Sequence, residues 1–368
     1  MLFKLLISRN VNPYYIRFLL QSYLNQELRV NYNGIASNWF KVSNGVKQGG
    51  VLSPTLFGVY IDGMLQEIKN KGLGCNVGDV NCGILGYADD VILLAPTRES
   101  LNAIVRCCES YAKSFHIKFN GKKSKLIVFG SSPQNIILNV NGERVDVVNE
   151  INYLGHVITN RKNDPMIKSV KNDFITKVNT FLGNFSCVSS DIKNALFKQY
   201  CTSFYGSQSC MMYHSSFNEL KIAWRKAMRR IWNVPYRTHG VLLPVISCQS
   251  PCDVIFYTRF MKHYISGLNH KNASIRDIFH SSMYNGGRLY KNLRHVVSYC
   301  KLKQFDVIDL TASSAENILY NAWADAVSED DLRVGCQIKE LCMMRDSWYD
   351  WCLNVSETND IINHLCTS

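Results

Sequence analysis

Apolar positions near the N-terminus recur with the spacing of a helix. In the stretch NVNPYYIRFLLQSYL, Ile16, Leu19 and Tyr23 fall on one face at steps of three and four residues. Asn12 followed by Pro13 is a typical helix start, because Asn accepts bonds from free N–H groups and proline suits the first turn. The pattern therefore predicts an amphipathic helix that begins at Pro13.

The polarity pattern then changes from a helical period to the two-residue period of strands. ELRVNYN (residues 27–33) and NWFKV (residues 38–42) are short alternating runs with β-branched and aromatic residues, and Gly34 lies between them. We expect a β pair joined by a turn at Gly34.

A glycine-rich loop precedes the next helical pattern. In GVKQGGVLSPTLFGVYIDGML, Gly49 and its glycine neighbours let backbone approach a ligand closely, while Gln48 can bond a base or sugar edge and Lys47 can meet a phosphate. Ser53 and Pro54 predict an N-cap and a first turn. The apolar positions of this predicted helix are Phe57, Tyr60, Ile61, Met64, Leu65 and Ile68.

Two adjacent acids interrupt an apolar stretch in GILGYADDVILLA (residues 83–95). Asp89 and Asp90 lie between two β-prone runs, which predicts a hairpin with the acids at its turn. One reading is purely structural, because Asp favours turns. The other is that two carboxylates on a rigid turn hold hard divalent cations.

Further elements follow in TRESLNAIVRCCESYAKSF, whose apolar residues have helical spacing. A polar turn with Lys123 among its lysines leads to a strand, LIVFG, and a second hairpin contains YLGHVIT (residues 153–159). Helices thus alternate with antiparallel strand pairs along this part of the chain.

Composition places the chain inside the cell. No apolar run reaches the roughly 18 residues of a membrane span, and the N-terminus has too short an apolar stretch for a secretory signal. The 14 cysteines form no CxxC pair and suit free core thiols in a reducing compartment. We therefore expect a nuclear or cytoplasmic protein, neither secreted nor membrane-spanning. The C-terminal group Cys342, Cys352, His364 and Cys366 has no recognisable zinc spacing.

Charge is distributed unevenly along the chain. Residues 161–303 contain 22 Lys and Arg against 6 Asp and Glu, whereas residues 304–368 contain 3 against 12. A basic excess of this size indicates a polyanion-binding region, with nucleic acid favoured over a merely solvated surface. The acidic end is rich in aromatic residues and Met, which suggests packed helices.

One basic helix is predicted in this middle region, in FNELKIAWRKAMRRIW. Its apolar positions are Leu220, Trp224, Ala227, Met228 and Ile231, and its basic positions are Lys221, Arg225, Arg229 and Arg230. The basic side can follow a phosphate backbone. Two alternatives to nucleic-acid binding are a basic helix face that is merely solvated and a calmodulin-like protein partner.

The order of these elements resembles the palm of reverse transcriptases, specifically those of non-LTR (LINE-type) retrotransposons. The matching stretches are GVKQGGVLSPTLF, YADD, FNGKKSKLIVFG and YLGHVI. AWRKAMRRIWNVPYRTHGVLLPV looks like the thumb of insect-type elements of the same group. A group II intron enzyme is a related alternative, against which the thumb-like run argues.

The resemblance implies an α+β fold and a division of the chain. Residues 1–130 would form a partial palm, an antiparallel sheet with packed helices, and residues 131–160 a hairpin like the primer grip. Residues 161–303 would form a basic helical thumb and connection, and residues 304–368 an acidic helical C-terminal region. The sequence indicates no oligomeric state.

The resemblance also implies chemistry for individual residues. Asp89, assisted by Asp90, would ligate catalytic Mg²⁺ or Mn²⁺, and Tyr87 would lie near the primer terminus. Partners would be an RNA template, a DNA primer and deoxynucleoside triphosphates. Nucleotide and template contacts would come from Lys47, Gln48, Gly49 and Lys123, primer-grip contacts from Tyr153, Leu154 and Gly155, and backbone contacts from Lys221, Arg225, Arg229 and Arg230.

One departure from the family pattern concerns a third carboxylate, which these polymerases take from a Phe-Asp motif on an earlier strand. Residues 1–50 contain no Asp, and their only acid, Glu27, belongs to a different element. We therefore expect an N-terminally truncated polymerase that is weak or inactive alone. Two alternatives stay open: a retained binding module for RNA or RNA–DNA hybrid, and a decayed copy that barely folds.

Overall fold

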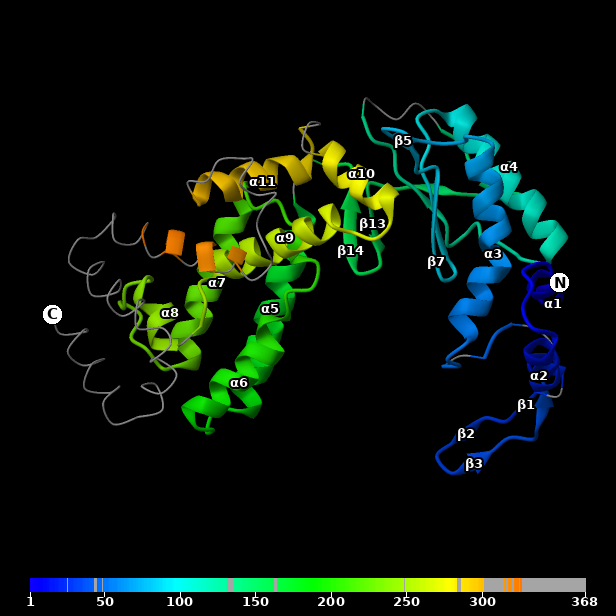
Figure 1. The fold of residues 1–368 in the computed structure, drawn as a ribbon. Coiled ribbons are helices and arrows are strands. Elements are labelled where there is room, and N and C mark those ends of the chain that lie inside the picture. The colour runs from blue at the N-terminus through cyan, green and yellow to red at the C-terminus, as the bar shows by residue number, and fades with distance from the viewer. Residues whose placement is uncertain are drawn as a thin grey trace. The chain divides into compact units, whose positions relative to one another are not determined.

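The computed structural model describes residues 1–24, 26–42, 45–47, 49–130, 136–161, 164–247, 249–282 and 286–300, and beyond these only 314, 315, 317–319, 321–323 and 325. The chain divides into two compact units. The first unit comprises residues 1–126 and 132–147, and the second, which we call the helical unit, comprises residues 127–131 and 148–368. Helices with strand pairs in the first and mainly helices in the second confirm the α+β class (Figure 1).

Helix α2 begins at the predicted signal, and α4 begins at a threonine cap. Tyr14 N–H donates to Asn12 Oδ1 at 2.9 Å at the start of α2, and Thr97 caps α4 by accepting from Ser100 N at 3.2 Å. The N-cap predicted for Ser53 is wrong, because its hydroxyl instead donates to the carbonyl of Lys47. The helices are α1 (Leu2–Ser8), α2 (Pro13–Leu24), α3 (Ser53–Asn70) and α4 (Arg98–Phe115).

Strands form separate two-stranded pairs within the described residues, not one continuous antiparallel sheet. All pairs are antiparallel except β9 with β12, which is parallel, and β9 is shorter than the predicted LIVFG strand. The pairs are β1 (Glu27–Leu28) with β4 (Phe40–Lys41), β2 (Asn31–Tyr32) with β3 (Ile35–Ala36), β5 (Asn76–Val77) with β6 (Val80–Asn81), β7 (Ile84–Tyr87) with β8 (Asp90–Leu93), β9 (Lys125–Leu126) with β12 (Asp146–Val147), β10 (Asn139–Val140) with β11 (Glu143–Arg144), and β13 (Glu150–Tyr153) with β14 (His156–Thr159).

The core of the first unit lies where α3 and α4 pack on the β7–β8 hairpin. Tyr111 of α4 stacks on Phe115 with ring centroids 4.0 Å apart, and its hydroxyl donates to Tyr60 O of α3 at 2.8 Å. Tyr60 in turn donates to Phe115 O at 2.5 Å. Cys107 and Cys108 belong to this core, and burial raises the pKa of Cys108 to about 12, as expected of an inert thiol.

Helices of the second unit surround one large core, which includes Phe174, Phe256 and Tyr264. All five apolar positions predicted for the basic helix α7 are buried in it. The helices are α5 (Pro165–Asn184), α6 (Ser190–Tyr200), η1 (Cys201–Ser203), η2 (Ser207–Ser209), α7 (Ser216–Ile231), α8 (Leu242–Ser247), α9 (Cys252–Leu268), α10 (Ala273–Ser282) and α11 (Arg288–Tyr299). The cysteine and histidine group at residues 342–366 lies outside the described residues.

Two buried polar side chains fix one segment of the helical unit. Asp164 caps α5 by accepting from Met166 N at 3.1 Å, and its other oxygen accepts from Met211 N. Asn292 of α11 accepts from Met212 N at 3.0 Å and donates to the carbonyl of Cys210 at 2.7 Å. The segment at residues 210–212 is thereby tied to α5 and α11.

Replacing the Asp164 carboxylate should therefore destabilise the helical unit. Asp164→Ala removes a helix cap, worth about 1 kcal/mol, and leaves Met211 N–H buried without an acceptor, worth about 1–3 kcal/mol. Thermal unfolding followed by circular dichroism should show a clear fall in Tm. Asp173→Ala, which removes an exposed ion pair with Lys177, is the control and should cost under about 1 kcal/mol. Equal effects of the two variants would contradict this account.

Candidate active site

The Asp hairpin, residues 84–93, carries its two acids at the tip. Tyr87 pairs with Asp90 at the end of the ladder, so Ala88 and Asp89 form the two-residue turn. Ala88 has a positive φ of 50°, a conformation that costs a residue other than glycine about 1 kcal/mol. The tight turn leaves Asp89, Asp90 and Tyr87 exposed.

Packing fixes the other end of the Asp hairpin. Ile84 is fully buried, and Val91 and Leu93 of the opposite strand pack on the same cluster of α3 and α4 side chains. Gly86 packs against α3, because a Cβ added to it would lie 3.5 Å from the side chain of Leu65. The hairpin is therefore held by an apolar face while its carboxylates stay in solvent.

Two glycines bring backbones into contact at the base of the Asp hairpin. A Cβ at Gly83 would lie 2.0 Å from the carbonyl oxygen of Leu73, and one at Gly74 would lie 2.2 Å from Gly83 Cα. Backbone hydrogen bonds extend the pairing of β7 and β8 beyond the strand ends. Leu94 N donates to Gly83 O at 2.9 Å, and Cys75 N donates to Leu94 O at 3.0 Å. No side chain fits between these backbones.

The carboxylates of the Asp hairpin are available for a ligand. Within the described residues, neither Asp89 nor Asp90 has a hydrogen-bond or ion-pair partner for its side chain. Carboxylate oxygens on a fixed backbone suit Mg²⁺, so the donor chemistry fits this ion. Among all the residues that the structure describes, no group of three or more His, Cys, Asp or Glu side chains is placed to hold a metal. Glu27, the only acid of residues 1–50, lies in β1.

The glycine loop, residues 45–50, is held against the start of α3. Lys47 O accepts from Gly50 N at 3.0 Å and from Ser53 Oγ at 2.6 Å, and Gly49 has a φ of 77° that favours glycine. The side chain of Lys47 is exposed. Gln48, predicted to contact nucleotide or template, lies outside the described residues.

The lysine turn presents Lys123 to solvent. Lys123 N donates to Asn120 Oδ1 at 3.0 Å, and Gly121 packs so closely that a Cβ would lie 2.6 Å from Glu143 Cβ. Lys125 is committed instead to an ion pair with Asp146 at 2.7 Å, which lowers the pKa of that carboxyl. Lys123 therefore remains free for an anion, within the described residues.

The grip hairpin, residues 150–159, turns through Leu154 and Gly155, both with positive φ. Tyr205 covers this turn: its hydroxyl donates to Leu154 O at 2.9 Å, and a Cβ on Gly155 would lie 2.6 Å from its ring. The resemblance to the family indicated the hairpin, but no sequence pattern indicated Tyr205.

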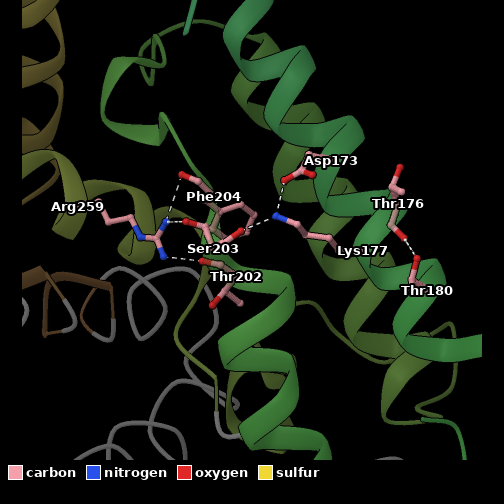
Figure 2. A network of polar contacts seen from close by, with 8 residues as sticks. All are labelled: Asp173, Thr176, Lys177, Thr180, Thr202, Ser203, Phe204 and Arg259. Atoms are coloured by element: carbon pink, nitrogen blue, oxygen red, sulfur yellow. Dashed lines mark hydrogen bonds and ion pairs between the residues drawn. The ribbon is translucent and has the colours of Figure 1, made fainter. Parts of the chain in front are cut away.

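An arginine clamp fixes the residues that precede Tyr205 (Figure 2). Arg259 of α9 points its guanidinium at the end of η1, donating to Thr202 O at 2.5 Å and also to the carbonyls of Ser203 and Phe204. Lys177 of α5 donates to Ser203 Oγ at 2.6 Å from the other side. The clamp therefore holds the backbone that carries Tyr205 to the grip hairpin.

The four basic residues predicted on α7 have different surroundings. Arg229 donates to Thr238 O at 2.8 Å, and Arg230 donates to Asn179 Oδ1 of α5 at 3.1 Å. Arg225 is exposed, whereas Lys221 is half-buried with its ammonium 5.6 Å from the centre of the Phe217 ring. Within the described residues, none of the four forms an ion pair.

Comparison with known protein families finds a match for the segment that contains the Asp hairpin. Residues 2–158 match the family model described as "Reverse transcriptase (RNA-dependent DNA polymerase)". The match covers the glycine loop, the Asp hairpin, the lysine turn and nearly all of the grip hairpin. Over residues 2–158 the chain is therefore similar to the reverse transcriptase family.

Three similar proteins indicate which kind of reverse transcriptase the chain resembles. The chain is 28% identical over 141 residues to the Retrovirus-related Pol polyprotein from type-1 retrotransposable element R2 of Nasonia vitripennis, which covers 38% of this chain and 14% of that protein. It is 23% identical over 247 residues to the RNA-directed DNA polymerase from mobile element jockey of Drosophila funebris, covering 61% of this chain and 26% of that protein. The Transposon TX1 uncharacterized 149 kDa protein of Xenopus laevis is 30% identical over 121 residues, which cover 32% of this chain and 9% of that protein.

These relatives confirm the non-LTR retrotransposon type of reverse transcriptase that the sequence motifs predicted. The chain spans about a quarter or less of the length of these relatives. No helix among the described residues is long and apolar enough to cross a membrane.

The contact at Gly83 generates a test of how the Asp hairpin is held. Gly83→Ala drives a methyl group into the Leu73 carbonyl and should cost roughly 3 kcal/mol, seen as a lower Tm of the full chain. Gly86→Ala, three residues further along in β7, meets only ordinary contacts and should change stability by less than about 1 kcal/mol. A tolerated Gly83→Ala would show that the two backbones are not in contact.

The different surroundings of the α7 arginines predict different phenotypes. Arg225→Gln should leave Tm unchanged and weaken binding of an RNA–DNA hybrid, reducing the magnitude of the salt slope of log K by about 1. Arg229→Gln removes the bond to Thr238 O and should lower Tm by an amount equivalent to about 1 kcal/mol. Fluorescence anisotropy with a labelled hybrid and thermal melts measure both. A salt slope that Arg225→Gln leaves unchanged would exclude a phosphate contact there.

Proposed function

We propose that this chain carries the metal-binding hairpin and the primer-binding hairpin of an RNA-directed DNA polymerase. The supporting observation is the exposed pair Asp89 and Asp90, which have no side-chain partner in the described part of the chain. They lie at the tip of an anchored hairpin, inside the segment that matches the reverse transcriptase family. The substrates would be an RNA template, a DNA primer and deoxynucleoside triphosphates.

Asp89 and Asp90 would hold Mg²⁺, with Mn²⁺ as a substitute. Bound divalent ions supply the charge that aligns the primer 3′-hydroxyl with the leaving pyrophosphate and neutralises negative charge in phosphoryl transfer. The tight turn and the buried face of the hairpin fix the backbone that carries these two carboxylates.

Other residues would position the nucleic acid. Tyr87 precedes the turn and is 62% exposed, so its ring is available to the sugar of the primer end. Lys47, Gln48, Gly49 and Lys123 would contact nucleotide and template. In the helical unit, the turn at Leu154 and Gly155, next to Tyr153, would contact the primer, and Tyr205 would hold that turn in shape.

The number of carboxylates in the site determines the rate of nucleotide incorporation that we expect. Since the described residues place no third acidic side chain with Asp89 and Asp90, the site would bind at least one of the two ions weakly. We therefore expect slow or no nucleotide incorporation by this chain alone. The alternative, a module that binds RNA or hybrid without chemistry, is not favoured by the polymerase relatives.

The test compares two aspartates that both lie at hairpin turns of the first unit. Mn²⁺ binding, followed by electron paramagnetic resonance of the free ion, should weaken at least 10-fold in Asp89→Asn and stay unchanged in Asp79→Asn, at the turn between β5 and β6. Any incorporation of a labelled nucleotide on a primed RNA should disappear with Asp89→Asn alone. Equal Mn²⁺ binding by parent and Asp89→Asn would overturn the proposal.

A further inference from the structure

Residues 26–42 form a ribbon that the polymerase chemistry does not use. This segment, which we call the arm, contains β1, β2, β3 and β4 and follows α2 in the chain (Figure 1). Asn33 and Gly34 make its turn with φ values of 50° and 82°, as expected for an Asn-Gly hairpin. All eight strand residues are exposed, so the arm has no cover within the described structure.

The two faces of the arm differ in chemistry. Leu28 pairs with Phe40 and Tyr32 pairs with Ile35, and residues 28 and 32 share a face because strand side chains alternate. Arg29 lies between them and therefore belongs to the opposite face. One face of the arm is apolar, and the other carries a cation.

Arg29 and Trp39 stack on each other on that second face. The guanidinium carbon of Arg29 lies 5.0 Å from the centre of the Trp39 ring. Ser37 N donates to Val30 O at 2.8 Å, so a single residue, Arg29, lies opposite both Asn38 and Trp39, which makes a bulge. The indole stays 60% exposed with the guanidinium beside it.

The segment of the chain that contains this stack has a net positive charge. Residues 1–50 contain six Lys and Arg and a single acid, Glu27, which lies opposite Lys41 in the arm. Arg29 has no ion-pair partner within the described residues. An exposed aromatic ring beside an unpaired arginine suits a base that stacks and a phosphate that pairs.

We propose that the Arg29–Trp39 face of the arm binds single-stranded nucleic acid, with one base stacked on the indole and a neighbouring phosphate on the guanidinium. This binding requires no metal and no chemistry at Asp89. A protein partner would instead be expected on the apolar face, where Ile35 is 78% exposed. Substitutions on the two faces therefore distinguish the two kinds of partner.

The experiment measures binding of a fluorescein-labelled oligouridine to the full chain by anisotropy. Trp39→Leu removes the π face and should weaken binding on the order of 10-fold, whereas Trp39→Phe keeps a stacking ring and should retain most of it. Arg29→Ala should reduce the magnitude of the salt slope by about 1. Ile35→Ala, on the apolar face, is the matched control and should bind like the parent chain.

Two outcomes would overturn the proposal. One is unchanged binding in Trp39→Leu; the other is a loss in Ile35→Ala as large as that in Trp39→Leu, which would point to the apolar face or to unfolding of the arm. Hydrogen exchange of the arm amides in Trp39→Leu separates these two causes. Asp89→Asn should bind the oligouridine like the parent chain, so a failed polymerase proposal and a failed arm proposal give different results.

Discussion

The backbone contact between Gly74 and Gly83 sets the position of the Asp hairpin in the first unit. Because neither residue has a side chain, Gly83, the residue before β7, lies directly against the chain at Leu73 and Gly74. Ile84 can then enter the core between α3 and α4, and the ladder to β8 follows. Burial at one end of a short hairpin is what allows two like charges to be held exposed at the other.

The helical unit uses polar contacts for the same purpose. The guanidinium of Arg259 binds three successive carbonyls, and the residue that follows them, Tyr205, fixes the turn of the grip hairpin. Asp164 and Asn292 hold the segment at residues 210–212 in a comparable way. The Asp hairpin is thus fixed at its base and the grip hairpin at its turn, so each hairpin with a proposed role in polymerisation has a fixed backbone, as preorganised catalysis requires.

Local signals in the sequence predicted much of this structure. The Asn-Gly turn, the start of α2 after Asn12 and the apolar face of α7 each depend on residues within one turn or one helix, and all are confirmed. Contacts between distant residues could not be predicted: Arg259 lies 55 to 57 residues from its carbonyls, and Tyr205 lies 51 residues from Leu154. For the same reason the pattern could not separate Arg229, which bonds Thr238 O, from the exposed Arg225.

The central claim is that Asp89 and Asp90 form a divalent cation site at the tip of the Asp hairpin. Anomalous diffraction from crystals of the full chain soaked in Mn²⁺ tests it directly. The account predicts an anomalous peak within coordination distance, about 2 Å, of a carboxylate oxygen of Asp89. A fully soaked crystal with ordered density for both side chains and no peak beside either carboxylate would contradict it.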